Sequence, residues 1–352
     1  MDIVELLVET ARRRASDLIL TAGSPPVLRV NGALEMMETR LLSAEDVKRC
    51  AYSLLSRDQV ARFEKELELD FSVTVDERYR FRANVYRQRG KTAVAFRLIP
   101  LEIPDFKELG LPKKLEEICR RANGLFLITG ATGMGKSTTL AAMVDHINTH
   151  RRTHIITIED PIEFVHLNKQ SVVDQREVGT DTMSFHTALK FALRQSPDVI
   201  VVGEMRDLET ISAALTAAET GHLVLATLHT RNGPQTVDRI VDSFPAHQQN
   251  QVREQLANSL IGVLSQRLFP RADGGGRALA TELLLNNYAV ANLIRERKVH
   301  QLPGVMETGQ KAGMYTFDMS IKALLLRRLV KKEDVEGFMT RSSLNAHGTG
   351  RF

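Results

Sequence analysis

The sequence predicts a mixed α/β fold, in which a small α+β domain precedes a parallel sheet covered by helices. In the first hundred residues, segments such as YRFRANVYRQ alternate in polarity, as strands of an antiparallel sheet do. Later, short and wholly apolar runs (LFLIT, HIITIE, DVIVVGE and LVLATLH) alternate with helical segments, which is typical of a parallel sheet. Three prolines between residues 100 and 113 predict a linker between the two parts.

The first part contains helix, strand and turn signals in a clear order. Residues 2–14 have apolar residues at helical spacing, and SDLILTAGSPPVLRVNGAL predicts two short strands with turns at GSPP and at Asn31-Gly32. Ser43 with Asp46 three residues later predicts a capped helix start. LDFSVTV, YRFRANVYRQ and TAVAFRLI then predict three further strands.

Composition excludes several classes of protein. The chain has 352 residues, which suits two domains, and a net charge of +4 with no basic block. Trp is absent and aromatic residues make up 5% of the chain, which argues against a surface that stacks single-stranded bases. We therefore expect a mildly basic solvated surface and no direct nucleic-acid partner.

The cysteines and the apolar runs bear on location. Cys50 and Cys119 lie far apart without a CxxC pair, so a thiol-rich zinc site is excluded and a disulfide framework is unsupported. The N-terminus has no signal-peptide pattern, and no apolar run approaches the ~20 residues that a membrane span needs. We therefore predict a soluble, cytoplasmic protein without a transmembrane segment.

Residues 130–137, GATGMGKS, match the G-x-x-x-x-G-K-[ST] motif between an apolar strand and a helix, which is the context that the motif requires. The glycines let backbone N–H groups face phosphates, Lys136 supplies positive charge to the β- and γ-phosphates, and Ser137 supplies a hydroxyl to Mg²⁺. The sequence therefore predicts a site for ATP and Mg²⁺. Its predicted nucleotide-binding residues are Gly130, Ala131, Thr132, Gly133, Met134, Gly135, Lys136, Ser137 and Thr138.

Phosphoryl transfer also needs groups that place the attacking water and hold the metal. Glu163 follows the apolar run HIITIE, and Glu204 ends DVIVVGE, where a metal-holding acid is expected. For Asp160 and Asp207 we expect solvated loop charges instead.

Two histidines bracket the run LVLATLH. His222 and His229 are seven residues apart, so on a strand they point to opposite faces and do not form a metal pair. His229 remains a candidate because it lies at the carboxyl end of a strand, where ligands of open α/β sheets bind.

Several motifs, in order along the chain, resemble the secretion ATPase superfamily of type II secretion and type IV pilus motors, and within it the PilT-like retraction ATPases. EDPIEF at 159–164 is similar to the family's Asp box, VVGEMRDLET at 201–210 to its atypical Walker B motif, and TGHLVLATLHT to its His box. NSLIGVLSQRL at 258–268 also fits, and ANLIRE at 291–296 resembles the C-terminal signature of retraction motors.

The resemblance implies roles for individual residues. Glu163 would polarise the attacking water, Glu204 would organise the magnesium ion, and His229 would report the state of the γ-phosphate. Arg82 and Arg97 stand where the family has arginines that complete the nucleotide site. Arg239 is a further candidate for such an arginine. Ser137 and Glu204 are the expected metal-binding residues.

The resemblance also implies an architecture and partners. It implies a PAS-like N-terminal domain, a RecA-like ATPase core, a helical C-terminal part and assembly into a homo-hexamer that powers pilus retraction and twitching motility. The inner-membrane pilus platform protein would be the partner, which would place the motor peripherally at that membrane, and paralogous pilus ATPases could join it. The predicted boundaries are 1–99 for the first domain, 100–113 for the linker, 114–270 for the core, 271–341 for the helical part and 342–352 for a disordered tail.

The sequence departs from the family pattern at Ala131, at Met134 and in the segment TRNGPQ after His229, and Ala131 leaves the subtype open. Ala131 stands where retraction motors usually have Pro, as it does in the PilU-like accessory branch, and Met134 stands where a small residue is usual. A PilU-like accessory and an assembly or type II secretion motor are therefore alternatives, although the chain lacks the tetracysteine site of the latter. A RecA-type nucleic-acid translocase and a ring that binds ATP without turnover belong to other classes. The Asp and His boxes argue against the first, and Glu163 with Glu204 against the second.

Overall fold

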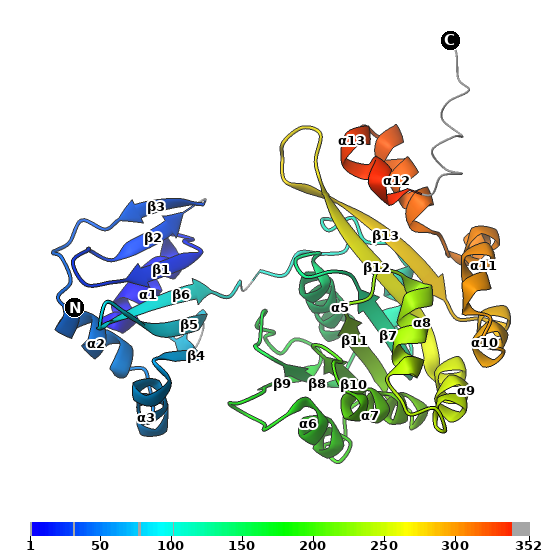
Figure 1. Ribbon diagram of the computed structural model, residues 1–352, viewed down its shortest axis with the longest axis horizontal. Helices are drawn as coiled ribbons and strands as arrows, with labels where there is room; N and C mark the ends of the chain where they lie inside the picture. The colour runs from blue at the N-terminus through cyan, green and yellow to red at the C-terminus, as the bar shows by residue number, and fades with distance from the viewer. Residues whose placement is uncertain (1, 31, 77–78, 101, 340–352) are drawn as a thin grey trace, which may run out of the picture. The chain divides into compact units, whose positions relative to one another are not determined.

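The computed structural model describes residues 2–30, 32–76, 79–100 and 102–339 (Figure 1). They form two compact units. The first contains the residues up to Glu102 together with Glu163–Val165, and the second contains Ile103–Ile162 and the residues from His166 onward. The predicted tail at 342–352 lies outside the described residues.

The first unit is built on an antiparallel sheet. Its strands are β1 (Asp17–Leu20), β2 (Val27–Val30), β3 (Ala33–Met36), β4 (Glu68–Val75), β5 (Tyr79–Gln88) and β6 (Lys91–Leu98), and its helices are α1 (Ile3–Arg12), α2 (Ala44–Tyr52) and α3 (Arg57–Glu66). The strand order is β3-β2-β1-β6-β5-β4, with neighbouring strands antiparallel (Figure 1). The strands predicted in this part are confirmed, and β3 and α3 are additions to the prediction.

Alternation along the strands separates a buried face from a polar face. On β5, Phe81, Ala83 and Val85 are fully buried and pack in one cluster with apolar residues of α1, α2 and α3. Arg82 lies between them in sequence, so its side chain points to the other face, where it is directly opposite Arg97 of β6. The polar face of this sheet therefore carries two neighbouring guanidinium groups.

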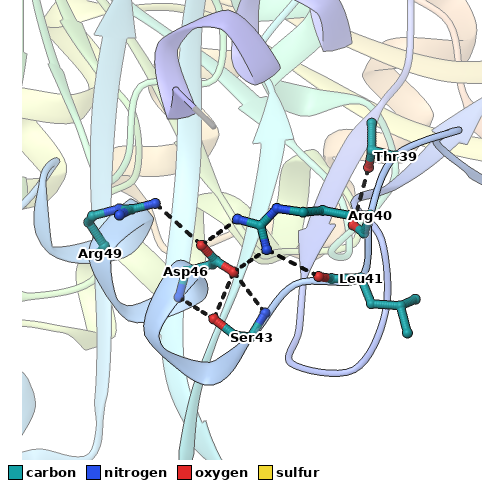
Figure 2. A network of polar contacts seen from close by, with 6 residues as sticks. All are labelled: Thr39, Arg40, Leu41, Ser43, Asp46 and Arg49. Carbon is teal, nitrogen blue, oxygen red and sulfur yellow. Dashed lines mark hydrogen bonds and ion pairs between the residues drawn. The ribbon is translucent and has the colours of Figure 1, made fainter.

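The start of α2 is the predicted capped helix start (Figure 2). Ser43 Oγ accepts a hydrogen bond from Asp46 N, and Asp46 Oδ2 accepts one from Ser43 N, which completes a capping box. Arg40 binds both oxygens of Asp46 at 2.8 Å, and Arg49 lies 3.3 Å from Oδ1. The capped helix start predicted from Ser43 and Asp46 is therefore confirmed, and the arginines strengthen it.

The second unit contains a larger sheet. Its strands are β7 (Gly124–Thr129), β8 (His154–Glu159), β9 (Val172–Glu177), β10 (Val199–Val202), β11 (Leu223–Leu228), β12 (Leu260–Pro270) and β13 (Arg277–Leu285). Its α-helices are α4 (Lys114–Cys119), α5 (Lys136–His150), α6 (Phe185–Ala192), α7 (Leu208–Glu219), α8 (Gly233–Asp242), α9 (Gln249–Ser259), α10 (Tyr288–Arg295), α11 (Leu302–Thr308), α12 (Phe317–Leu326) and α13 (Lys332–Val335). Short 3₁₀ helices lie at Val299–Gln301, Gly309–Ala312 and Glu336–Phe338.

The strand order of this sheet is β13-β12-β7-β11-β10-β8-β9. All neighbouring pairs are parallel except β12 with β13. Every residue of β7, β10 and β11 is buried, because helices cover the sheet, and this accounts for the apolar runs in the sequence. The predicted α/β fold with a parallel sheet is confirmed.

Most of the segment predicted as a linker belongs to the second unit. Phe106 and Leu111 are buried in its core, and the Phe106 ring stacks on His146 of α5 with centroids 5.0 Å apart. The division between the units falls between Glu102 and Ile103. The prolines of 100–113 therefore mark a segment that mostly packs on the core, because its apolar side chains are buried there.

The predicted boundary at 270/271 falls in the turn of the β12–β13 hairpin. β13 pairs with β12 along its whole length, so the sheet extends to Leu285 and the mainly helical part begins at α10. Toward the turn, Phe269 of β12 and Ala280 of β13 form a small separate core with Ile321 of α12. Helices α12 and α13 lie beside this end of the hairpin (Figure 1).

None of the helices within the described residues combines the length and the apolar character that crossing a bilayer requires. Cys50 and Cys119 are both buried and neither is in a disulfide.

Candidate nucleotide site

The strand order brings the predicted P-loop, histidine and glutamate residues of the second unit to the carboxyl ends of neighbouring strands. β7, β11, β10 and β8 are consecutive neighbours. Their carboxyl ends lead to the P-loop, to His229, to Glu204 and to the loop that contains Glu163. Because ligands of open α/β sheets bind at the carboxyl ends of the strands, this end of the sheet is the candidate site.

The P-loop backbone needs glycine at its first position. Gly130 has a φ of 148°, and a Cβ atom there would lie 2.6 Å from the carbonyl oxygen of Gln266 on β12. At the other end, Gly135 has a φ of 82° and is the N-cap of α5. The loop therefore runs close to β12 and delivers Lys136, Ser137 and Thr138 to the first turn of a 15-residue helix, where backbone N–H groups favour phosphate.

Residues of β12 and β13, which no sequence motif indicates as part of the site, support the P-loop. Leu268 N donates to the sulfur of Met134 at 3.3 Å, and Arg277 Nη1 donates to the carbonyl oxygen of Gly133 at 3.0 Å. Gln266 is buried beside the loop. The methionine that departs from the family pattern is thus bonded to the neighbouring strand. In the sequence, the Gln266 amide in LSQRL and the Arg277 guanidinium in GGRA are the signals that hint at this support.

Lys136 is buried at the centre of the site. Its ammonium donates to the carbonyl oxygens of Gly130 at 2.9 Å and Ala131 at 3.1 Å, and it lies 3.3 Å from His229 Nδ1. The structure therefore joins two residues that were predicted separately, from the P-loop and from the His box.

His229 in turn contacts Glu204. Its Nε2 lies 2.9 Å from Glu204 Oε1, and the imidazole is 42% exposed. Because Lys136 can only donate, Nδ1 must accept, so the proton of a neutral ring is on Nε2 and is donated to the carboxylate. Lys136, His229 and Glu204 thus form one hydrogen-bonded chain across three neighbouring strands.

Arg206, also not identified from the sequence, completes this chain. Its Nε lies 2.8 Å from Glu204 Oε1, and its Nη2 donates to Oε2 at the same distance. Burial alone would raise the pKa of Glu204, but the hydrogen bonds from Arg206 and His229 outweigh it and hold the pKa below its ordinary value. Glu204 is therefore an ionised carboxylate at neutral pH.

Ser137 and Glu204 suit magnesium in their chemistry. Both present oxygen donors, and magnesium at nucleotide sites needs only one or two protein ligands beside the phosphates. Within the described residues no group of three or more His, Cys, Asp or Glu could hold a metal ion, so an all-protein metal cage is not found there. The residues present fit a metal that binds together with the nucleotide.

The remaining predicted acids differ in their surroundings. Glu163 is exposed in the loop after β8. Asp207, expected to be a solvated charge, instead accepts hydrogen bonds from Thr210 N at 2.7 Å and Thr210 Oγ1 at 3.0 Å, and so caps α7. His222 precedes β11 and lies 3.1 Å from the carbonyl oxygen of Ala217, a structural contact.

The predicted arginines are not part of the hydrogen-bonded chain. Arg97 binds Asp17 at 2.9 Å and Arg82 lies 4.0 Å from Asp70, all on the polar face of the first unit's sheet. Arg239 is exposed on α8. The structure brings Arg82 and Arg97 together, although fifteen positions separate them in the sequence.

Two buried carboxylates near the site were also missed. Glu177 of β9 accepts a hydrogen bond from Ile162 N at 3.0 Å, in the loop of Glu163. Glu282 of β13 accepts one from Gly233 N at 2.9 Å, at the start of α8 and four residues after His229. Burial raises the pKa of Glu282 to about 7, against the lowering effect of this bond and one from the Phe317 backbone. An acid inside the apolar run ALATELLL was the available signal.

A parallel sheet with a P-loop after one strand and a His–Glu pair after the next two defines a P-loop ATPase of the secretion type. A model of the type II/IV secretion system protein family matches residues 4–333. The chain therefore belongs to this family.

The relatives refine that assignment. The type IV pilus retraction ATPase PilT of Pseudomonas aeruginosa is 47% identical over 334 residues, which cover 95% of this chain and 97% of that protein. The type IV pilus ATPase PilU of the same organism is 40% identical over 334 residues, 95% of this chain and 87% of that one. A crystal structure of the pilus retraction motor PilT with bound ADP superposes with a TM-score of 0.90 at 48% identity, over 98% of this chain and 99% of that one. The predicted resemblance to PilT-like ATPases is confirmed.

Proposed function

We propose that this chain hydrolyses ATP to power the retraction of type IV pili, and so drives twitching motility. The observation that carries the proposal is the chain of contacts from Lys136 through His229 to Glu204, after the carboxyl ends of β7, β11 and β10. These are the groups that a nucleotide-driven motor needs in one place, in a chain whose similarity to PilT extends over nearly its whole length.

Each residue of the site has a proposed part in hydrolysis. Lys136 binds the β- and γ-phosphates, to which the N–H groups of the P-loop also donate. Glu163 orients the attacking water and accepts its proton. Ser137 and Glu204 would hold the magnesium ion, which would neutralise charge on the phosphate oxygens.

His229 links hydrolysis to movement in this proposal. A γ-phosphate competes for the Lys136 ammonium, which otherwise lies beside His229 Nδ1. His229 also donates to Glu204, so its imidazole ring contacts both the Lys136 ammonium and the Glu204 carboxylate, and a shift of Lys136 would alter the position of both other side chains. The loop after β11 would therefore differ between the ATP and ADP states.

The proposed assembly is a homo-hexamer of chains with a PAS-like first domain and a RecA-like core. We propose that Arg82 and Arg97, with Arg239 as a further candidate, complete the nucleotide sites of the ring. The helical part after β13 would carry the retraction signature ANLIRE at 291–296. The partner would be the inner-membrane platform protein, which would hold the motor on the cytoplasmic side, and paralogous pilus ATPases could act with it.

The test is a count of surface pili and a measurement of twitching speed in cells whose gene carries Glu163→Gln. A retraction motor that uses its own hydrolysis gives many pili and no movement. Cells without pili would instead indicate an assembly motor and would contradict the proposal.

A second candidate is an accessory retraction ATPase of the PilU kind. Ala131 of the P-loop, which is shared with that branch, favours it, whereas the greater identity to PilT argues against it. Normal piliation with normal movement in the Glu163→Gln strain would favour the accessory role.

A further inference from the structure

The loop that carries Glu163 is held at both ends by side chains of one edge strand. β9 lies at the edge of the sheet and pairs with β8 in parallel, with Gln175 opposite Thr157 and Glu177 opposite Glu159. Gln175 and Glu177 are two residues apart, so their side chains lie on the same face of the strand. The loop from residue 160 to 166 connects from the end of β8 and passes these two side chains.

At the start of the loop, Glu177 binds its backbone. Ile162 N, directly before Glu163, donates to Glu177 Oε2 at 3.0 Å. Glu177 is only 4% exposed, and Thr180 Oγ1 lies 3.4 Å from its Oε1. A hydrogen bond at a buried position is shielded from water and is electrostatically stronger than one in solvent, so the peptide before Glu163 is held firmly.

At the end of the loop, Gln175 binds its backbone. His166 N donates to Gln175 Oε1 at 2.7 Å, and Gln175 Nε2 donates to Glu159 Oε1 at 3.1 Å. Glu159 Oε1 also accepts from Thr157 Oγ1 at 2.7 Å. Together these contacts tie the loop to β8 and β9.

We propose that Glu177 and Gln175 are positioning residues for hydrolysis, which fix the backbone on either side of Glu163 so that its carboxylate reaches the attacking water. The inference rests on the proposed function, because it needs Glu163 as the water-activating group. Ile162 and His166 are themselves buried, at 4% and 9% exposure, whereas Glu163 between them is exposed. Such an arrangement holds the ends of a short segment and leaves the reactive side chain accessible.

The hydrogen-bond model makes a specific distinction between two substitutions. Glu177→Gln keeps an acceptor for Ile162 N, so kcat stays within about threefold of wild type. Glu177→Ala removes the acceptor and lets Glu163 shift, which lowers kcat about tenfold or more, because misplacement by about 1 Å can cost up to about 100-fold. KM stays within about twofold, since the P-loop is untouched. The matched control is Asp174→Ala, an exposed acid on the opposite face of β9 that binds His154 at 2.9 Å. This control keeps the wild-type rate.

The experiment measures steady-state kcat and KM and the single-turnover rate of ATP hydrolysis by the purified full chain in these variants, in Glu163→Gln and in Glu163→Gln/Glu177→Ala. If Glu177 acts through Glu163, the double variant is no slower than Glu163→Gln alone. A Glu177→Ala variant at the wild-type rate, a Glu177→Gln variant as slow as Glu177→Ala, or multiplicative losses in the double variant would each overturn the positioning role.

Two further outcomes remain interpretable. If Glu177→Ala does not fold, Gln175→Leu at the half-buried end of the bracket replaces it, and its wild-type rate would overturn the proposal. A wild-type rate in Glu163→Gln would refute both the proposed catalytic role of Glu163 and the positioning role that depends on it. Multiplicative losses would leave the proposed function intact and refute only the positioning role.

Discussion

Each unit of the chain has a carboxylate that is largely buried and accepts several hydrogen bonds, but the two carboxylates behave in opposite ways. In the first unit, Asp46 accepts from Arg40 and Ser43, and these bonds hold its pKa far below the ordinary value. In the second unit, burial raises the pKa of Glu282 to about 7. A carboxylate clamped by guanidinium stays ionised, whereas one inside an apolar strand gives up its charge near neutral pH.

The two units are therefore expected to differ in which property a substitution changes, stability in the first and mainly hydrolysis in the second. The Asp46 network surrounds the cap of helix α2 in the first unit, and none of its residues has a proposed part in ATP hydrolysis (Figure 2). In the second unit, Lys136, His229 and Glu204 contact one another after the carboxyl ends of the strands, and Glu282 accepts a hydrogen bond from a backbone N–H four residues after His229. Substitutions in the first network should therefore change stability, those at Lys136 and His229 should change hydrolysis, and Glu282→Gln should change how stability depends on pH.

The largest effect is expected for Lys136→Gln. Loss of the ammonium removes the charge that faces the β- and γ-phosphates, and the loss of one such preorganised donor costs about 100- to 1,000-fold in kcat. Steady-state ATP hydrolysis measures this, with Lys190→Gln on the exposed side of α6 as control. A Lys136→Gln rate near that of the control would contradict the nucleotide site.

A smaller loss is expected for His229→Ala. It removes the donor to Glu204 at 2.9 Å and leaves Arg206 in place. A charge-assisted hydrogen bond of about 1.5–3 kcal/mol corresponds to roughly 10- to 100-fold in rate. Hydrolysis and fluorescent ATP binding should be measured together, because kcat should fall while affinity is retained. The matched control is His222→Ala at the other end of β11, which should hydrolyse ATP at the wild-type rate.

Glu282→Gln should change the pH dependence of stability. The folded pKa of about 7 lies above the ordinary 4.5, so the contribution of this group is fully present below pH 4.5 and is lost as the pH rises through 7. The loss amounts to roughly 3 kcal/mol. Between pH 5 and pH 8 the melting temperature should fall further for the wild type than for Glu282→Gln. Equal falls in melting temperature would show that Glu282 stays ionised in the folded state.

The smallest effect is expected for Ser43→Ala in the first unit. Loss of the cap costs about 1 kcal/mol of stability, and the hydrolysis rate of the folded protein stays unchanged.

Asp46 has a lowered pKa, so its contribution to stability is present above pH 4 and is lost on acidification, opposite to that of Glu282. Unfolding curves of Arg40→Ala at pH 3 and pH 7 test this sign, since the variant should lose the most stability at pH 7.

Many of the site residues, and the helix cap of the first unit, could be predicted from the sequence. The P-loop, the strand-end residues Glu204 and His229 and the cap at Ser43 each depend on local spacing, which a single sequence displays. The neighbouring order of β7, β11, β10 and β8, which places these residues together, depends on tertiary packing and is not contained in local spacing.

Other parts could not be predicted, for a physical reason. β9 has the sequence VVDQRE, whose polar residues resemble a loop, and it forms a strand only because β8 supplies a partner. Its residues Gln175 and Glu177 then look like ordinary surface residues until the loop of Glu163 is seen beside them. β13 likewise lies within the predicted helical part at 271–341, but it pairs with β12 as a strand, and its apolar run ALATELLL suits a buried strand.

The most direct test of the site is the single-turnover rate of ATP hydrolysis by Glu163→Gln, measured with its affinity for ATP. If Glu163 activates the water at the carboxyl ends of β7, β8, β10 and β11, the rate falls about 100-fold or more. ATP should still bind with wild-type affinity, because Lys136 and the P-loop are intact. A Glu163→Gln chain that hydrolyses ATP at the wild-type rate would contradict this assignment and would require another residue as the base.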